Sequence, residues 1–275
     1  MTRFVLALCL VGGVLLSGGC GGDYVLTVPD MVAPAGGEGV AVVRIQRVDF
    51  MFVPTSVKGA LIQLQVEDKP NRGAYSDAFG YAGTTLAVPD KPGRYKLNAS
   101  HSDHWGDEVR AESRAYVWDP KAPAVAVDLD CLPGMVLGFS KQSSLALGRA
   151  AKGANILYLT RRGSSSHARL HAELARAGYP DGPILEWQRQ YWRIVRDGKY
   201  GNWPRAVFEN RLVSQLPDLR TMLPGLTAGI CEDYLAAKAF AEANMRVVVV
   251  GGAKVEAKDV VRRASWSELA EKGTF

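Results

Sequence analysis

Short stretches in which apolar and polar residues alternate dominate the chain from residue 24 to residue 118. This alternation, interrupted by turn-forming residues at near-regular spacing, is typical of strands with one buried face. The candidate strands span residues 40–45, 60–66, 84–88, 95–99 and 114–118. Segments rich in Gly, Pro, Asp or Asn separate them at residues 34–39, 69–73, 89–93 and 103–107. The pattern predicts a β-sandwich.

The pattern changes after residue 118. Two prolines within residues 119–123 predict a stiff linker. Continuously apolar runs then predict strands buried on both faces, at residues 124–127, 156–159, 227–230 and 246–250. Segments with helical periodicity lie between them, at residues 166–177, 205–216 and 234–244. Strands that alternate with helices favour a parallel sheet covered on both faces.

The first 20 residues differ from both halves. Arg3 precedes an apolar run at residues 4–16, which has the length of a signal-peptide hydrophobic region and is too short to span a bilayer. The small residues 17–19 and the following Cys20 resemble a bacterial lipoprotein lipobox, which implies lipidation of Cys20. Ordinary secretion with cleavage nearby is the alternative. We therefore expect a signal peptide at residues 1–19, a lipidated tether at residues 20–28, and a membrane-anchored protein in the cell envelope that faces the periplasm or the exterior.

Length and charge narrow the remaining possibilities. The chain has 275 residues and a formal net charge of +5. Without the first 20 residues it is long enough for two domains with cores of their own, which we expect at residues 29–118 and 119–275. Its basic residues form no dense cluster interleaved with aromatics, so we expect no nucleic-acid partner.

Two aspartates end the first apolar run of the second half. Asp128 and Asp130 are one residue apart, so on an extended strand their side chains would point the same way. Open α/β sheets place their ligands at the carboxyl ends of the strands. Two carboxylates held close together there repel each other unless a bound cation, a shared proton or a role in catalysis compensates for the repulsion. The pair is therefore a candidate site.

Residues 120–275 resemble the haloacid dehalogenase-like superfamily of phosphohydrolases, and within it they are most similar to the phosphatidate-phosphatase-like branch. The resemblance rests on three motifs in order: the pair Asp128 and Asp130, the strand end at Thr160, and the acidic motif Glu232-Asp233. Residues 76–82 and 92–95 in turn resemble bacterial immunoglobulin-like domains. The expected architecture is thus an immunoglobulin-like β-sandwich followed by a three-layer α/β domain with a parallel sheet.

The resemblance also implies an activity, the hydrolysis of a phosphate monoester through an aspartyl-phosphate. Asp128 would be the nucleophile, and Asp130 would protonate the leaving group and later activate water. Thr160 would bind the phosphoryl oxygens. Arg205 or Arg211 would supply the positive charge that a lysine usually gives, and the sequence does not choose between them.

A metal ion belongs to the same implied mechanism. Mg²⁺ would lie between the anionic nucleophile and the anionic substrate, held by Asp128, Asp130, Glu232 and Asp233. The substrate would be a phosphorylated small molecule or a lipid headgroup.

Several residues depart from the family pattern. Cys131 follows the aspartate pair where a glycine is usual, and Cys231 and Glu232 replace the usual Gly-Asp of the last motif. These changes leave a second reading open, a pseudophosphatase that binds a ligand or partner without turnover. A third reading is an envelope adhesion or scaffold protein whose sandwich carries the function.

In the resembling fold, Cys131 and Cys231 replace glycines at matching positions on neighbouring strands. Neighbouring strands are about 4.8 Å apart, within reach of a disulfide. A bridge between the two cysteines is thus one hypothesis for an exported protein, and two buried reduced thiols are the other.

Two histidine-containing segments have simpler interpretations. His101 and His104 lie with aspartates in a stretch that reads as a solvated hairpin turn rather than a metal site. His167 and His171 have helical spacing, and we expect them on the surface beside the apolar face of their helix.

Overall fold

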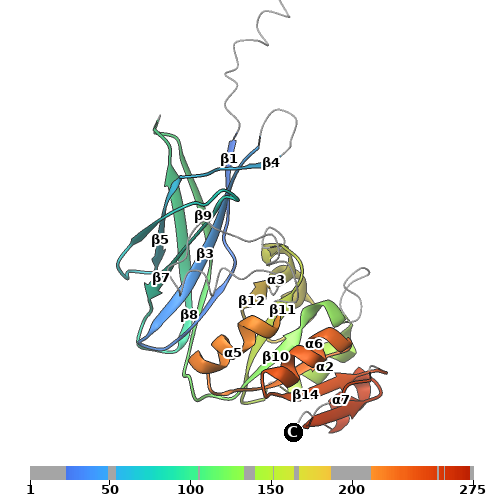
Figure 1. Cartoon of the computed structure of the whole chain (residues 1–275). Helices are drawn as coiled ribbons and strands as arrows, with labels where there is room; N and C mark the ends of the chain where they lie inside the picture. Colours follow the sequence, from blue (N-terminus) through green and yellow to red (C-terminus); the bar gives the residue numbers. More distant parts are fainter. Residues whose placement is uncertain are drawn as a thin grey trace, which may run out of the picture.

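The computed structural model describes residues 23–48, 54–104, 106–132, 140–150, 152–163, 167–186, 212–252, 254–256 and 258–272. The expected signal peptide, Cys20, Arg205 and Arg211 lie outside these residues. Two sheets form one end of the molecule, antiparallel except for the parallel pair at residues 31–34 and 115–118, and a parallel sheet with its helices forms the other (Figure 1). No helix in the described ranges is long and apolar enough to cross a bilayer.

The first antiparallel sheet is built around one long strand. This strand, β3 (Glu38–Val48), pairs antiparallel with three neighbours: β1 (Asp23–Thr27), β4 (Pro54–Ser56) and β7 (Tyr81–Ala87). The pairing of β1 corrects the sequence expectation for residues 20–28. From Asp23 onward the chain belongs to the sheet and is not a free tether, because its apolar positions complete one edge of the sandwich.

The second sheet has five strands, in the order β2 (Met31–Pro34), β9 (Glu108–Trp118), β8 (Gly93–Ser102), β5 (Leu61–Val66) and β6 (Arg72–Tyr75). Alternation decides which side chains it buries. Along β5, Ile62, Leu64 and Val66 are fully buried, whereas Gln63 and Gln65 are only partly so. Most buried side chains of both sheets form one hydrophobic cluster, as expected of a sandwich.

The second half contains a six-stranded sheet in which every pair is parallel. Its order is β12 (Ile184–Glu186), β11 (Asn155–Thr160), β10 (Ala124–Asp128), β13 (Leu226–Cys231), β14 (Arg246–Val250) and β15 (Val260–Arg263). After β10 the chain adds β11 and β12 on one side of it, and then adds β13, β14 and β15 on the other side. The strand order therefore reverses between β10 and β13, which makes their carboxyl ends a topological switch point.

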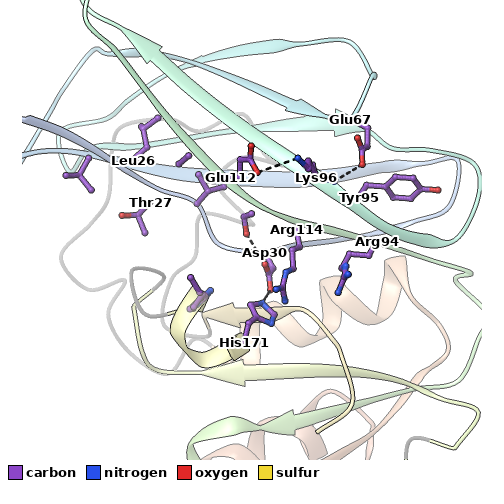
Figure 2. Close-up of a pocket in the computed structure, with 16 residues that line it drawn as sticks. Leu26, Thr27, Asp30, Glu67, Arg94, Tyr95, Lys96, Glu112, Arg114 and His171 are labelled. Atoms are coloured by element: carbon purple, nitrogen blue, oxygen red, sulfur yellow. Dashed lines mark hydrogen bonds and ion pairs between the residues drawn. The ribbon is translucent and has the colours of Figure 1, made fainter. Parts of the chain in front are cut away.

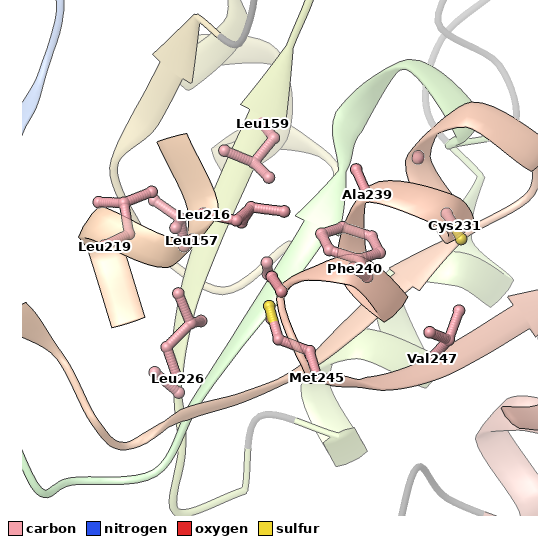
Figure 3. Packing of buried hydrophobic residues seen from close by; sticks show 14 of the residues in the cluster. Leu157, Leu159, Leu216, Leu219, Leu226, Cys231, Ala239, Phe240, Met245 and Val247 are labelled. Atoms are coloured by element: carbon pink, nitrogen blue, oxygen red, sulfur yellow. The ribbon is translucent and has the colours of Figure 1, made fainter. Parts of the chain in front are cut away.

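Helices cover both faces of this sheet. Ala124 and Ala126 of β10 face one layer and Val125 and Val127 the other, so a strand buried on both sides needs a continuous apolar run. One layer holds α5 (Leu212–Met222) and α6 (Tyr234–Glu242), shown in Figure 3. The other holds α2 (Lys141–Ala150), α3 (His167–Arg176) and α7 (Trp266–Lys272).

The two halves share a core. Val32, Tyr116 and Trp118 of the antiparallel sheet belong to the same buried cluster as α5, α6 and one face of the parallel sheet. The segment at residues 119–123 is anchored as well, because the backbone N–H of Gly225 donates to the carbonyl of Pro120 at 2.9 Å. The expected linker is thus part of a packed junction.

Candidate functional site

The switch point of the parallel sheet gathers most of the acidic residues that the sequence singles out. Strand β10 ends at Asp128, and a single 3₁₀ turn, η1 (Leu129–Cys131), follows at once. The Asp128 carboxylate accepts the backbone N–H of Asp130 at 3.1 Å and caps this turn. The two aspartates are therefore not alternate residues of one extended strand, as expected, because local capping ends the strand first.

Asp130 is held by the end of the neighbouring strand. The hydroxyl of Thr160 donates to its Oδ1 at 2.8 Å. The backbone N–H and the Nε of Arg161 donate to its Oδ2 at 2.7 and 3.0 Å. Parallel pairing of β10 with β11 brings these groups together.

Arg161 joins this carboxylate to a third one. Its guanidinium also donates to Asp233 Oδ2 at 3.3 Å, while Asp233 Oδ1 accepts the backbone N–H of Ala236 and caps α6. One partly exposed arginine thus serves two carboxylates at the sheet edge. The sequence contained this residue beside Thr160, and its place directly after a strand end was the available signal.

Asp128 differs from its neighbours because part of its carboxylate is unsatisfied. The side chain is buried, and its Oδ2 accepts no hydrogen bond from an N–H or O–H donor within the described residues. Burial first, and then the nearby carboxylates of Asp130 and Asp233, raise the pKa of Asp128 to about 7. The protonated form is also favoured by a hydrogen bond with the Asp233 carboxylate.

Glu232 turns toward a different part of the molecule. Its Oε1 accepts the indole N–H of Trp266 on α7 at 2.6 Å, and burial raises its pKa. Across the described ranges, no group of three or more His, Cys, Asp and Glu side chains is arranged to hold a metal ion. Asp130 and Asp233 instead share the single positive charge of Arg161, and the expected Mg²⁺ site stays a prediction.

The two cysteines are free thiols in this structure, which agrees with the second of the two hypotheses. Strand register explains this: Val127 pairs with Ile230, which puts Cys231 at the level of Asp128 rather than of Cys131. Cys131 lies further along the 3₁₀ turn, where its thiol donates to the Asp128 carbonyl at 2.8 Å. Burial raises the pKa of both thiols, which is the property of inert buried cysteines.

A second polar cluster, which the sequence did not indicate, joins the two halves. Asp30 is buried between β1 and β2, and its carboxylate accepts from Ser113 Oγ at 2.8 Å, from Ile184 N–H at 2.8 Å and pairs with His171 Nε2 at 2.6 Å (Figure 2). The surface position expected for His167 and His171 is therefore wrong. Both are buried, because α3 packs this face against the sandwich.

Comparisons with known proteins assign no family. No family model matches the chain, and no curated protein matches it. Among solved structures, the exo-chitosanase CsxA of Amycolatopsis orientalis aligns with 86% of this chain and 33% of its own, at 11% identity and a TM-score of 0.33. A family 39 glycoside hydrolase from Bacteroides cellulosilyticus WH2 aligns with 83% of this chain and 51% of its own, at 11% identity and a TM-score of 0.26.

A third solved structure is an immunoglobulin-like protein. Tandem Ig repeats of Dlar align with 40% of this chain and 60% of theirs, at 11% identity and a TM-score of 0.25. The chain thus spans less than two thirds of the length of each of these three proteins. No function follows from these matches.

These findings correct the family expectation. The matching structures include glycoside hydrolases and an immunoglobulin-like protein, with no haloacid dehalogenase-like protein among them. Membership of that superfamily is therefore wrong, and the phosphatase activity loses the resemblance on which it rested. The parallel sheet and the antiparallel sheets remain as the architecture of the chain.

Proposed function

We propose that this chain is a ligand-binding protein of the cell envelope whose ligand presents a positively charged hydrogen-bond donor to Asp128. The observation that carries this proposal is the buried Oδ2 of Asp128, which accepts from no N–H or O–H donor in the described part of the chain. A buried acceptor without a donor costs free energy, and a bound donor removes that cost. The envelope location rests on the signal sequence and Cys20.

The charges around Asp128 favour an ammonium group as the donor. Asp130 and Asp233 lie close enough to raise the pKa of Asp128, so the site has more negative than positive charge once Asp128 ionises. A cation placed there favours the ionised carboxylate and displaces its proton. Binding should therefore strengthen as the pH rises through about 7.

The same edge also has a feature for an anionic group. The Arg161 side chain is 43% exposed while it bonds to Asp130 and Asp233. Arginine suits phosphate because its planar donors match phosphate oxygens. A zwitterion such as phosphoethanolamine, the polar part of a lipid headgroup or a free phosphorylated amine, carries both complementary groups.

Calorimetric titration of the full chain in a polyoxyethylene detergent tests the proposal. Phosphoethanolamine should bind at pH 8, and about tenfold more weakly at pH 6, where most of Asp128 is protonated. Phosphocholine has the same charges but no N–H donor, and it should bind at least tenfold more weakly at pH 8. Asp128→Asn should weaken phosphoethanolamine binding to a similar extent.

The control variant is Glu256→Gln, which removes an exposed carboxylate elsewhere on the α/β half. It should leave binding unchanged. Equal affinities for phosphoethanolamine and phosphocholine, or an Asp128→Asn variant that binds as wild type does, would show that Asp128 accepts no ligand. Absence of binding to phosphoethanolamine at either pH would overturn the proposal outright.

A further inference from the structure

A trough lies on the outward face of the sheet that contains β5, β8 and β9. Its volume is about 360 Å³, near the lower end of the ordinary range for small-molecule sites. Because side chains alternate along β5, Gln63 and Gln65 point away from the core. Strand register places Gln63 opposite Ser100 and Gln65 opposite Asn98. Uncharged polar side chains therefore form the floor of this trough.

Most polar groups of this floor are available to a ligand. The amides of Gln63 and Asn98 and the hydroxyl of Ser100 make no hydrogen bond within the described residues. All three side chains line the trough and are only partly buried, so their polar ends stay open to it. The amide N–H of Gln65 donates to the Lys69 carbonyl at 2.9 Å, which leaves the Gln65 amide oxygen as an acceptor. The floor thus presents donors and acceptors side by side.

The charged side chains beside the floor are paired with one another. Arg110 bonds to Glu108 at 2.8 Å, and Lys96 lies 3.8 Å from Glu112 (Figure 2). A charged ligand would find no spare counter-charge here, whereas an uncharged ligand disturbs neither pair. The charges of the trough therefore favour an uncharged ligand.

An exposed aromatic ring stands beside one end of the floor. Tyr75 of the edge strand β6 is 67% exposed and pairs with Leu61, which precedes Gln63 by two residues and shares its face. Gly73 lies opposite Gln63, and a Cβ there would lie 3.5 Å from the Gln63 amide. Since glycine has no side chain, β6 leaves this amide uncovered. An open ring next to open amides suits a sugar, whose C–H face packs on the ring while its hydroxyls meet the amides.

We propose that this trough binds a neutral saccharide, with Gln63 and Asn98 as its hydrogen-bonding partners and Tyr75 as its stacking surface. A sugar hydroxyl both donates and accepts, so neighbouring hydroxyls satisfy both ends of one side-chain amide. An uncharged peptide is the rival ligand. It would add a strand to the free edge of β6 through backbone hydrogen bonds, and it would need none of these three side chains.

Saturation-transfer NMR of the full chain, in a polyoxyethylene detergent at pH 7, tests the proposal with matched probes. The neutral disaccharides cellobiose, maltose and lactose are compared with cellobiouronate, which carries one carboxylate, and with N-acetyl-tetraalanine amide, an uncharged peptide. At least one neutral disaccharide should bind, with an affinity at least tenfold above those of cellobiouronate and the peptide. Gln63→Met and Asn98→Leu keep the approximate size of the side chain and remove its amide. Each should weaken binding of that disaccharide at least tenfold.

Two further variants make the result decisive. Tyr75→Ser removes the ring at an exposed position, and it should weaken binding even if an amide variant does not fold, which circular dichroism reports. Gln46→Met is the matched control, because Gln46 is a half-buried glutamine on β3 of the other sheet, and it should change nothing. Binding of no disaccharide, equal or tighter binding of cellobiouronate or the peptide, or disaccharide binding that all three trough variants leave intact would overturn the proposal.

Discussion

The proton on Asp128 links the candidate site to the stability of the protein. Its pKa is raised from 3.8 in the open chain to about 7 in the fold, so between these values the folded state holds more protons than the unfolded state. The free energy of unfolding must then fall as the pH rises through this window, and the loss is complete above about pH 7. Asp128→Asn has no proton to lose. Relative to wild type, it should gain on the order of 3 kcal/mol in unfolding free energy between pH 4.5 and 7.5, measured by urea denaturation.

The exposed carboxyl of Glu256 provides the comparison. Glu256→Gln should run parallel to wild type across the same pH range, because it leaves Asp128 and its neighbours unchanged. Parallel curves for Asp128→Asn as well would show that Asp128 is ionised in the folded protein. The proposed acceptor would then have an ordinary acidity.

At the level of elements, the contact between β13 and α6 depends on Gly229, which has no side chain. A Cβ at Gly229 would overlap the Phe240 ring, which is itself fully buried (Figure 3). Overpacking of a core contact costs about 1–3 kcal/mol, and here neither the strand nor the helix has room to move. Gly229→Ala should lower the free energy of unfolding by about 3 kcal/mol, measured by urea denaturation at pH 7.

The matched control uses the same substitution on a free surface. A Cβ at Gly148 of α2 meets nothing within 4 Å, and alanine favours a helix over glycine by about 1 kcal/mol. Gly148→Ala should therefore raise the stability slightly. If Gly229→Ala were as harmless, α6 could not be seated on β13 as the structure has it.

Local pattern predicts the elements well where burial alone decides them. Strand β14 (Arg246–Val250) has the bounds of its apolar run, and α3 and α6 begin within a residue of their expected starts. Short strands such as β2 and β12 were missed because each has few residues and obtains its burial from distant partners. The 3₁₀ turn after Asp128 was also missed, since the Asp128 side chain caps this turn where the pattern predicts a continuing strand.

At the scale of the whole molecule, the junction between the halves has no sequence signal. Asp30 lies 141 residues from His171 and 154 from Ile184, and no local motif relates them. The carboxylates of the sheet edge were easier to find, because parallel strands bring their ends to one edge whatever the connections are. The sequence could not indicate which carboxylates would pair with Arg161 and which would keep an oxygen without a donor, because that depends on side-chain directions.

The junction is testable through Asp30 itself. Removing its carboxylate leaves the donors of His171, Ser113 and the Ile184 backbone without an acceptor in a buried place, at about 1–3 kcal/mol for each group that water does not reach. Asp30→Ala should therefore lose about 3 kcal/mol or more of unfolding free energy, and the segment at residues 119–123 should be cut faster by protease as the halves separate. Asp68→Asn, at an exposed turn of the sandwich, should change neither quantity. An Asp30→Ala protein with wild-type stability and wild-type cleavage would mean that the shared apolar cluster around Trp118 alone holds the halves together, with the buried carboxylate contributing orientation rather than strength.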